Sequence, residues 1–368
     1  MSNSTQSAGL LKQKQIDTAR DLAAKAEKDC KLAKAQLAML HEHNWLNIFT
    51  PTNYGGLQAE LPEAMEQVEA MSWADGSAGW LAAKSAIAGF SGGFIPVEVA
   101  KGLFAGEKTF VTGVNDIMGI AEKTASGYTV TGEWKHIAGM SEAAALVVNC
   151  YIAENGQAMQ DNSNKLQVVS LVLLKDELAI TACNTMGLSG AGCHDAKASD
   201  LKIPADRAFT ITGEKAVNNA RLYQYPYIQL SEAILAASIS GMGTYFVELC
   251  QEMLATMKGN DNKPLTEDNL VQDALEKHVQ KMNDARVKLY YAAELTWQAC
   301  ANQQNIKDTI LYKVSAAAQD MTRRTRECAD ALYPFCGMAA ADKTSEINRV
   351  WRNLHTAGQE RLIVFGGM

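Results

Sequence analysis

The chain has 368 residues, enough for two or three domains, and its 47% hydrophobic and 20% charged residues are typical of a soluble globular protein. The formal net charge of −7 disfavours a nucleic-acid-binding role, because binding to phosphates needs a basic surface. The first 15 residues are polar and no run of about 18 apolar residues stands out, so we expect no export signal, no membrane span and a cytoplasmic location.

The eight cysteines are scattered without a CxxC pair, so we expect free thiols in a reducing compartment. Cys193, His194 and Asp195 are adjacent, but neighbouring residues of a strand point to opposite faces, so they cannot act together and Cys193 is predicted to be structural. His41 and His43 have no third ligand near them in the sequence and are predicted to lie on the surface. We therefore predict no metal site.

The first part of the chain is predicted to form an N-terminal helical domain, residues 1–107. Asp75 or Ser77 can cap a helix whose small residues, from Ala78 to Gly93, permit close packing or the close approach of a ligand. We consider the later part of this run, Ala82–Gly93, a candidate lining of a substrate pocket. The other helices are predicted within residues 10–47, over Leu61–Met71 and over Pro96–Leu103.

The middle of the chain is predicted to form an all-β domain, residues 108–212. Short runs of β-favouring residues alternate there with glycines, which suit turns. The predicted strands lie within Gly127–Gly139 and over Ala145–Ile152, Leu166–Leu174, Leu178–Cys183 and Ala196–Ile203.

The last part, residues 213–368, is predicted to be an antiparallel four-helix bundle. Its helices are Gln229–Met257, Asn269–Ala301, Thr309–Leu332 and Thr344–Gln359, and Tyr333–Ala341 is predicted to be a loop. Gly241 and Gly243 weaken the first helix by roughly 1 kcal/mol each, so we expect a tight contact there. The fold class is thus α+β and multidomain: a helical domain, a β-barrel or β-sandwich, and a helix bundle.

Five segments in this order resemble the acyl-CoA dehydrogenase superfamily, over about residues 40 to 362. Each keeps residues of a family motif. The segments are WADGSAGW (Trp73–Trp80), GYTVTGEWKHIAG (Gly127–Gly139), MGLSGAGCHDAKASDLKIPADRAF (Met186–Phe209), YPFCGM (Tyr333–Met338) and VWRNLHTAGQE (Val350–Glu360).

This resemblance implies a flavoprotein with FAD or FMN bound between the β domain and the bundle, a small-molecule substrate and a homotetramer. The superfamily contains acyl-CoA dehydrogenases and two-component flavin monooxygenases, which use O2 and reduced flavin from a separate reductase. The last motif favours the monooxygenase branch. An acyl-CoA dehydrogenase and a non-catalytic, degenerate member remain alternatives.

The resemblance implies flavin contacts on three segments of the β domain. Val111 and Thr112 match the strand that meets the pyrimidine edge of the flavin, although the following loop, 112–116, lacks the family's phosphate-binding turn. His136 and Ala138 match residues that face the ring, but Ala138 lacks the family's hydroxyl. Ser141 is a possible substitute for it, or simply a turn residue.

Two further segments match the family's contacts to the adenine half of FAD only in part. Met257–Pro264 has neither the Arg nor the Phe of the family, and the Gly-Gly loop is reduced to Phe335 and Gly337 around Cys336. These losses are compatible with FMN, with transient use of reduced flavin or with weak flavin binding.

Three residues are candidates for catalysis. Glu360 stands eight residues after Arg352, where the monooxygenases carry a His, but it has the residue type of the dehydrogenase base. Glu232 falls near a second position at which dehydrogenases place this base. His355 suits the monooxygenases, because an imidazole can exchange protons near neutral pH beside a flavin. Each glutamate could also be a solvated helix-end charge, and His355 an ordinary helix residue.

Overall fold

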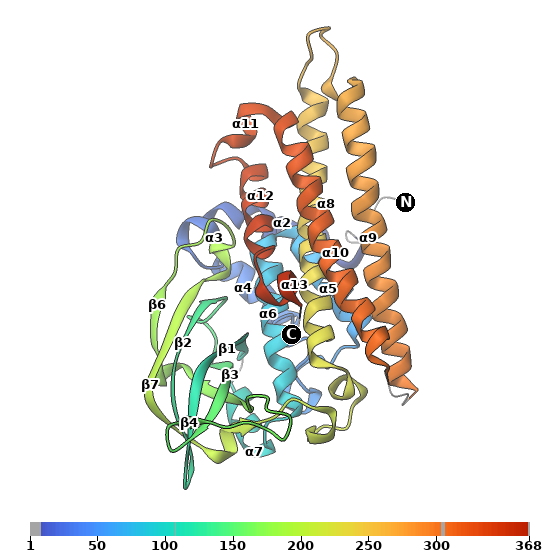
Figure 1. Ribbon diagram of the computed structural model, residues 1–368. Coiled ribbons are helices and arrows are strands. Elements are labelled where there is room, and N and C mark those ends of the chain that lie inside the picture. Colours follow the sequence, from blue (N-terminus) through green and yellow to red (C-terminus); the bar gives the residue numbers. More distant parts are fainter. Residues whose placement is uncertain (1–8, 107, 303–305, 367–368) are drawn as a thin grey trace.

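The computed structural model describes residues 9–106, 108–302 and 306–366, and it contains helices, then strands, then helices (Figure 1). The predicted fold class is confirmed in this order of elements. The long helices of the last part stand beside the sheet, and the helix α6 (Gly76–Gly89) of the first part lies between the two (Figure 1). The domain boundaries at 107/108 and 212/213 stay predictions.

The N-terminal helices pack around two buried members, α5 and α6. The carboxylate of Asp75 accepts a hydrogen bond from the backbone N–H of Ala78 (2.8 Å), which confirms that Asp75 caps α6. All of α6 is buried, as its small residues allow. The helices are α2 (Gln13–Asp21), α3 (Ala23–Asp29), α4 (Lys34–Glu42), α5 (Leu61–Ala74), α6 (Gly76–Gly89) and α7 (Val97–Phe104).

The strands form one eight-stranded mixed sheet with the order β6-β7-β2-β1-β3-β5-β8, and β4 pairs with β3. The strands β1 and β3 are parallel, and the other pairs are antiparallel. The sheet has its own core, which includes Trp134, Leu146, Val148 and Leu171. The strands are β1 (Val111–Thr124), β2 (Gly127–Ile137), β3 (Ala145–Glu154), β4 (Gln157–Ala158), β5 (Val168–Leu174), β6 (Ala179–Ala182), β7 (His194–Pro204) and β8 (Ala208–Phe209).

Residues 112–116, interpreted from the sequence as a loop, belong to the strand β1 instead. The register of β1 against β3 shifts between Gly113 and Ile117, so the segment is an irregular strand. Its polar residues Asn115 and Asp116 interrupt the apolar alternation, which is why the pattern did not predict a strand.

The C-terminal part contains three long helices, α8 (Tyr227–Thr256), α9 (Asn269–Ala301) and α10 (Asp308–Leu332), and the shorter α12 (Glu346–Ala357). The helix α5 also packs along α8. A Cβ on Gly241 would lie 2.1 Å from the carbonyl oxygen of Glu69, which confirms the predicted tight contact at this glycine. The predicted loop 333–341 is wrong: it consists of a 3-10 turn, Tyr333–Cys336, and the short helix α11 (Gly337–Ala341).

Within the described residues, α8 is the one helix long and apolar enough to cross a membrane by length and composition. The sequence predicted this helix but not a membrane-span candidate, because serine, glycine and threonine interrupt its apolar residues. However, 89% of the apolar window is buried inside the protein, as in the core helix of a folded bundle.

Candidate functional site

A cavity of about 410 Å³ lies where the sheet, α6 and the end of the bundle meet. Residues 183–193 connect β6 to β7 and form one wall, and we call this segment the 183–193 loop. The short helix α13 (Arg361–Phe365) follows α12 on the opposite side. The lining includes Trp80 and Lys84 of α6, His136 and Ala138 at the end of β2, Met186 and Leu188 of the loop, and His355, Thr356 and Glu360.

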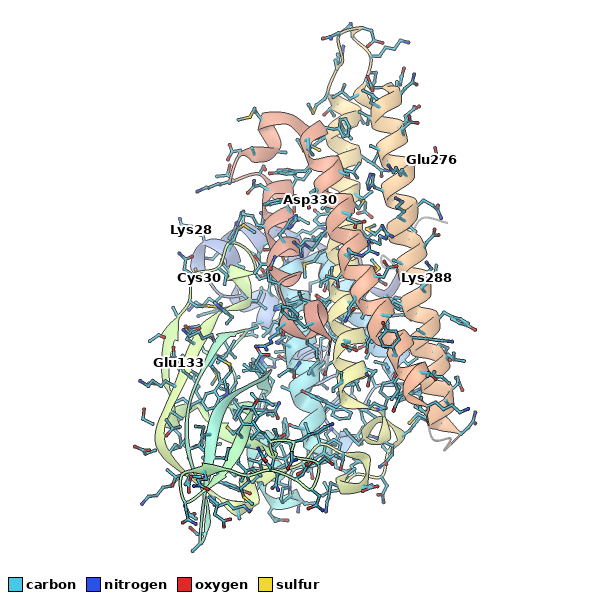
Figure 2. All side chains as sticks on the ribbon, in the orientation of Figure 1. Lys28, Cys30, Glu133, Glu276, Lys288 and Asp330 are labelled. Carbon is cyan, nitrogen blue, oxygen red and sulfur yellow. A yellow bond between two sulfur atoms is a disulfide. The ribbon has the colours of Figure 1, made fainter. Side chains whose placement is uncertain are left out.

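His355 of α12 is buried against aromatic and charged neighbours. Its ring centroid lies 4.1 Å from that of Trp351, and its Nε2 lies 3.0 Å from a carboxylate oxygen of Asp330 on α10 (Figure 2 labels Asp330). Burial lowers the pKa of His355 below its usual value, although the Asp330 carboxylate opposes this shift. The lowered pKa favours the neutral imidazole, and because Nε2 faces Asp330, Nδ1 is the ring nitrogen left for another partner.

Both carboxylates that line the cavity have cationic partners. Glu360 Oε2 lies 3.2 Å from Lys84 Nζ, and their side chains are 21% and 7% exposed. Asp116 of β1 lies 3.9 Å from the guanidinium of the exposed Arg361. The carboxylate of Glu360 is therefore held in an ion pair and is not free to approach a carbon acid. Lys84, the one lysine of α6, is thus paired with Glu360 across the cavity.

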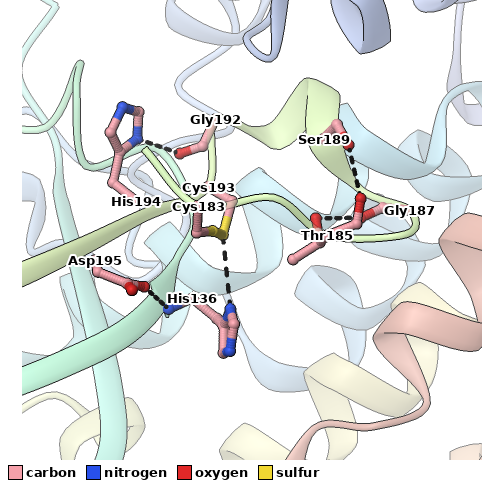
Figure 3. Close-up of a disulfide and its surroundings, with 9 residues drawn as sticks. All are labelled: His136, Cys183, Thr185, Gly187, Ser189, Gly192, Cys193, His194 and Asp195. Atoms are coloured by element: carbon pink, nitrogen blue, oxygen red, sulfur yellow. Dashed lines mark hydrogen bonds between the residues drawn. A yellow bond between two sulfur atoms is a disulfide. The ribbon is translucent and has the colours of Figure 1, made fainter. Parts of the chain in front are cut away.

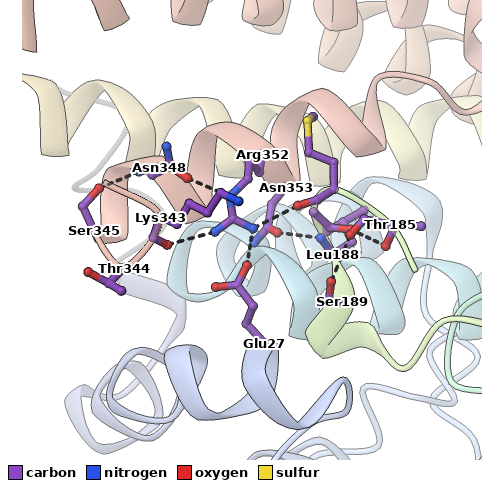
Figure 4. A network of polar contacts seen from close by, with 12 residues as sticks. Glu27, Thr185, Leu188, Ser189, Lys343, Thr344, Ser345, Asn348, Arg352 and Asn353 are labelled. Atoms are coloured by element: carbon purple, nitrogen blue, oxygen red, sulfur yellow. Dashed lines mark hydrogen bonds and ion pairs between the residues drawn. The ribbon is translucent and has the colours of Figure 1, made fainter. Parts of the chain in front are cut away.

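The 183–193 loop is docked on α12 by two residues of the last sequence motif (Figure 4). Arg352 donates a hydrogen bond to the carbonyl oxygen of Met186 (2.9 Å) and forms an ion pair with Glu27. Asn353 Oδ1 accepts the backbone N–H of Leu188 (2.6 Å). The motif residues Arg352 and Asn353 therefore position the loop that forms one wall of the cavity.

Two cysteines pair at the base of the same loop (Figure 3). Cys183 and Cys193 form a disulfide, so the expectation that all cysteines are free thiols is wrong for this pair. The pair could not be predicted from the sequence, because ten positions separate the two cysteines and the pairing of β6 with β7 brings them together. His136 Nδ1 lies 4.0 Å from Cys193 Sγ.

Four of the predicted site residues line the cavity: His136, Ala138, His355 and Glu360. Val111 and Thr112 are buried beside it instead. The hydroxyl of Thr112 donates a hydrogen bond to the carbonyl oxygen of Ala138 (2.7 Å). Thr112 thus fixes the backbone at the end of β2 and does not face the cavity.

The remaining candidates do not line the cavity. Ser141 lies in the turn after β2, and Phe335 and Gly337 lie near α11, at the end of the bundle far from the sheet (Figure 1). Glu232 is fully buried in α8 and accepts a hydrogen bond from Ser315 of α10. The structure therefore brings Glu360, but not Glu232, to the site.

The sequence reasoning missed Trp80, Lys84 and Thr356. Lys84 carries the one charge in the run from Ala78 to Gly93, and a lone charge on a buried helix predicts a partner or a ligand. The small residues of Ala82–Gly93, which were considered a candidate pocket lining, pack inside the helical core instead. Within this run, Lys84 lines the cavity.

The residues at the cavity fit a flavin ring. Trp80, Met186, Leu188 and Ala138 give it apolar walls suited to a planar aromatic system. Thr356 lines the cavity, and its buried hydroxyl has no hydrogen-bond partner among the described residues, so it can pair with a polar edge of a ligand. His136 adds a further ring nitrogen at the sheet side.

Comparison with known proteins identifies the fold of this chain. Residues 233–364 match the model of the acyl-CoA dehydrogenase C-terminal domain family. XiaF from Streptomyces sp., solved in complex with FADH2 and glycerol, superposes with a TM-score of 0.83 at 17% identity and covers 98% of this chain and 93% of its own. The predicted resemblance and fold are thereby confirmed: the chain has the fold of the acyl-CoA dehydrogenase superfamily.

Sequence relatives narrow the class further. The indole-3-acetate monooxygenase of Pseudomonas putida is 22% identical over 341 residues, which cover 91% of this chain and 85% of that protein. The flavin-dependent monooxygenase oxygenase subunit HsaA of Mycobacterium tuberculosis is 21% identical over 349 residues, with coverage of 91% and 86%. The predicted class, a flavin-dependent oxidoreductase of the acyl-CoA dehydrogenase-like fold, is confirmed by these relatives.

Proposed function

We propose that this chain is the oxygenase component of a two-component flavin monooxygenase, which takes reduced FAD or FMN from a separate reductase and uses O2. The observation that carries this proposal is the ion pair between Lys84 and Glu360 (3.2 Å). An acyl-CoA dehydrogenase needs a free carboxylate in a dry pocket, whereas here the carboxylate of Glu360 is held in an ion pair. The oxygenase names of the relatives support the same choice.

The residues of the cavity have separable tasks in this function. Reduced flavin, when bound, supplies the electrons that activate O2. Trp80 and Leu188 exclude water from the ring, and Thr356 offers a hydroxyl to its polar edge. His355, neutral and oriented by Asp330, holds or moves a proton at Nδ1.

The cavity supports a small aromatic substrate. Its walls are mostly apolar, and Glu360 and Asp116 are paired with Lys84 and Arg361 of the same lining, so a flat, largely uncharged ring suits it better than a long acyl chain with a nucleotide. The named substrate of one relative, indole-3-acetate, is a reasonable first compound to test.

We also propose a homotetramer. Apolar side chains lie exposed on the outer faces of the long helices, and three of them, Val287, Tyr291 and Leu295, follow each other at intervals of four residues along α9. Such a stripe is typical of a surface that packs against another subunit. Light scattering after size-exclusion chromatography, with Tyr291→Lys as the variant, tests this assembly.

The reaction is tested by mixing the protein with chemically reduced FMN or FAD, 18O2 and indolic or phenolic compounds. We expect one 18O atom in the product by mass spectrometry, and a loss of at least about tenfold in Asn or Ala variants of His355. The opposite result is reduction of bound oxidised flavin by an acyl-CoA without oxygen, which would identify a dehydrogenase. Absence of both reactions, and of binding of any flavin, would leave the non-catalytic alternative.

A further inference from the structure

The 183–193 loop carries cavity residues between two cysteines that can close it covalently. Thr185, Met186 and Leu188 of this loop line the cavity, and Cys193 at its end lines it as well. We propose that Cys183 and Cys193 form a reversible, peroxide-driven disulfide that locks the 183–193 loop beside the flavin cavity. The proposal rests on the proposed function only for the source of the peroxide.

The backbone holds the two cysteines in position without the covalent bond. Ala182 and His194 pair across β6 and β7, and the N–H of Cys183 donates a hydrogen bond to the carbonyl oxygen of Cys193 (3.2 Å). The Cα atoms lie 5.5 Å apart, within the range that a disulfide needs. The thiols therefore stay opposite each other in the reduced protein, and closing the bond requires no rearrangement of the strands.

Cys193 is placed to react first. It lines the cavity, and Nδ1 of His136 lies 4.0 Å from its sulfur, close enough to favour the thiolate (Figure 3). Other cysteines lack this setting: burial raises the pKa of Cys150 and of Cys328 to about 12. Cys183, directly opposite, is the resolving thiol.

The oxidant is a product of the proposed chemistry. Reduced flavin and O2 give oxidised flavin and hydrogen peroxide whenever no substrate takes up the oxygen. The thiolate of Cys193 attacks one peroxide oxygen, the O–O bond breaks, and Cys193 sulfenic acid and hydroxide form. The Cys183 thiol then attacks this sulfur, an S–S bond forms and water leaves. A dithiol reductant reverses the step by exchange and is itself oxidised to a disulfide.

The bond changes how firmly one wall of the cavity is held. In the reduced state the loop keeps only non-covalent ties, among them Leu188 to Asn353, and Gly139 N–H to the carbonyl oxygen of Ala191 (2.8 Å). The disulfide closes the base of the loop with a covalent bond. It therefore restricts the local opening of the residues between the two cysteines. Oxidation is therefore expected to protect the backbone amides of residues 184–192 from hydrogen exchange.

The test uses the full chain, reduced with dithiothreitol, freed of reductant and treated with stoichiometric hydrogen peroxide in the absence of flavin and in the presence of a chelator. Differential alkylation and peptide mass spectrometry follow each cysteine with time. Cys30, exposed at the end of α3 (Figure 2), is the matched control. We expect Cys183 and Cys193 to lose alkylation together, at least about tenfold faster than Cys30.

Three further readouts separate a switch from a structural bond. In Cys183→Ser, Cys193 should stop at a sulfenic acid that dimedone traps, whereas Cys30→Ser should behave like wild type. In His136→Asn the oxidation of Cys193 should slow by about tenfold or more. Amide hydrogen exchange in 184–192 should slow by about tenfold on oxidation and recover with dithiothreitol.

Three results would overturn the proposal. One is oxidation of Cys30 as fast as that of Cys193. Another is a Cys183–Cys193 bond that dithiothreitol reduces only after unfolding. The third is zinc retained by the reduced protein before chelation, because the donor atoms of His136, Cys183 and Cys193 lie within 4.8 Å of one another and would then form a metal site. Because no flavin is present, none of these results depends on monooxygenase activity.

Discussion

Replacing Glu360 by Gln tests whether this carboxylate is a catalytic base or the partner of a buried cation. Lys84 Nζ lies 3.2 Å from Glu360 Oε2, and the two side chains are 7% and 21% exposed. Gln has nearly the same shape as Glu, so the substitution removes the charge without a change in volume. Lys84 is then left in a mostly buried position without a counter-charge.

The size of the effect follows from the geometry. Two unit charges 3.2 Å apart attract each other by about 5 kcal/mol at an effective dielectric constant of about 20. Desolvation of Lys84 and the water that reaches Glu360 offset part of this attraction. We therefore expect Glu360→Gln to lower the free energy of unfolding by about 2–3 kcal/mol, and Lys84→Met, which leaves the more exposed partner, by about 1–2 kcal/mol.

The matched control is the double variant Lys84→Met with Glu360→Gln. Because both charges are gone, its free energy of unfolding should lie within about 1 kcal/mol of wild type. A double variant equal to wild type would give a coupling energy of about 3–5 kcal/mol in urea unfolding, the combined loss of the two single variants. Hydroxylation by Glu360→Gln should fall by less than about tenfold, whereas loss of a general base costs about 10²–10⁴-fold. A stable Glu360→Gln protein that has lost all reactivity would refute the reasoning and make Glu360 the base.

Three further predictions concern Asp75 at the start of α6, His355 and Gly187. Burial raises the pKa of Asp75 from 3.8 to about 6, so the folded state binds this proton more tightly than the unfolded state and stability falls as pH rises from about 4 to 6. Asp75→Asn keeps a capping side chain, and we expect it to remove this slope and to raise the free energy of unfolding at pH 7 by up to about 3 kcal/mol, measured by urea unfolding at pH 4.5 and 7. For His355 the pH dependence of stability has the opposite sign. Its pKa is lowered in the folded state, so stability is lost as pH falls from about 6.5 toward that pKa. His355→Asn should show less of this loss in the same titration. Gly187→Ala places a Cβ 2.2 Å from the carbonyl oxygen of Arg352, so it should push the 183–193 loop away from α12. We expect it to lower the free energy of unfolding by about 1–3 kcal/mol and to weaken flavin binding in a fluorescence titration. Unchanged binding would show that the loop is not part of the flavin site.

Local patterns were sufficient for most of the secondary structure. The helix α9 begins and ends at the predicted residues, Asn269 and Ala301, and α5, α8 and α10 agree within a few positions. The apolar run Ala145–Ile152 forms the first part of β3 (Ala145–Glu154). These elements have a clear helical period or a continuous apolar run, so neighbouring residues determine them.

The site could be predicted only in part, because most of its contacts join distant segments. His136, Ala138, His355 and Glu360 were found through motifs, since the motif carries the position of the residue. The pairing of Lys84 with Glu360 joins positions 276 residues apart, and no local pattern contains it. Ten positions separate the disulfide partners, whose meeting depends on the β6–β7 register.

The same contacts indicate how residues outside the cavity control it. Asn348 Oδ1 accepts a hydrogen bond from the Arg352 side chain (2.7 Å), and Arg352 in turn binds Met186 of the loop and Glu27 of α3. The last motif therefore does more than contribute His355 to the cavity: it joins the bundle, the N-terminal helices and the sheet at one loop. Because these ties meet at the 183–193 loop, a change at Asn348 should act on the cavity through Arg352 and the loop wall. Asn348 also donates hydrogen bonds to the hydroxyl of Tyr333 (2.7 Å) and to the carbonyl oxygen of Ala340 (3.2 Å), so such a change should lower both the flavin affinity and the stability of the bundle.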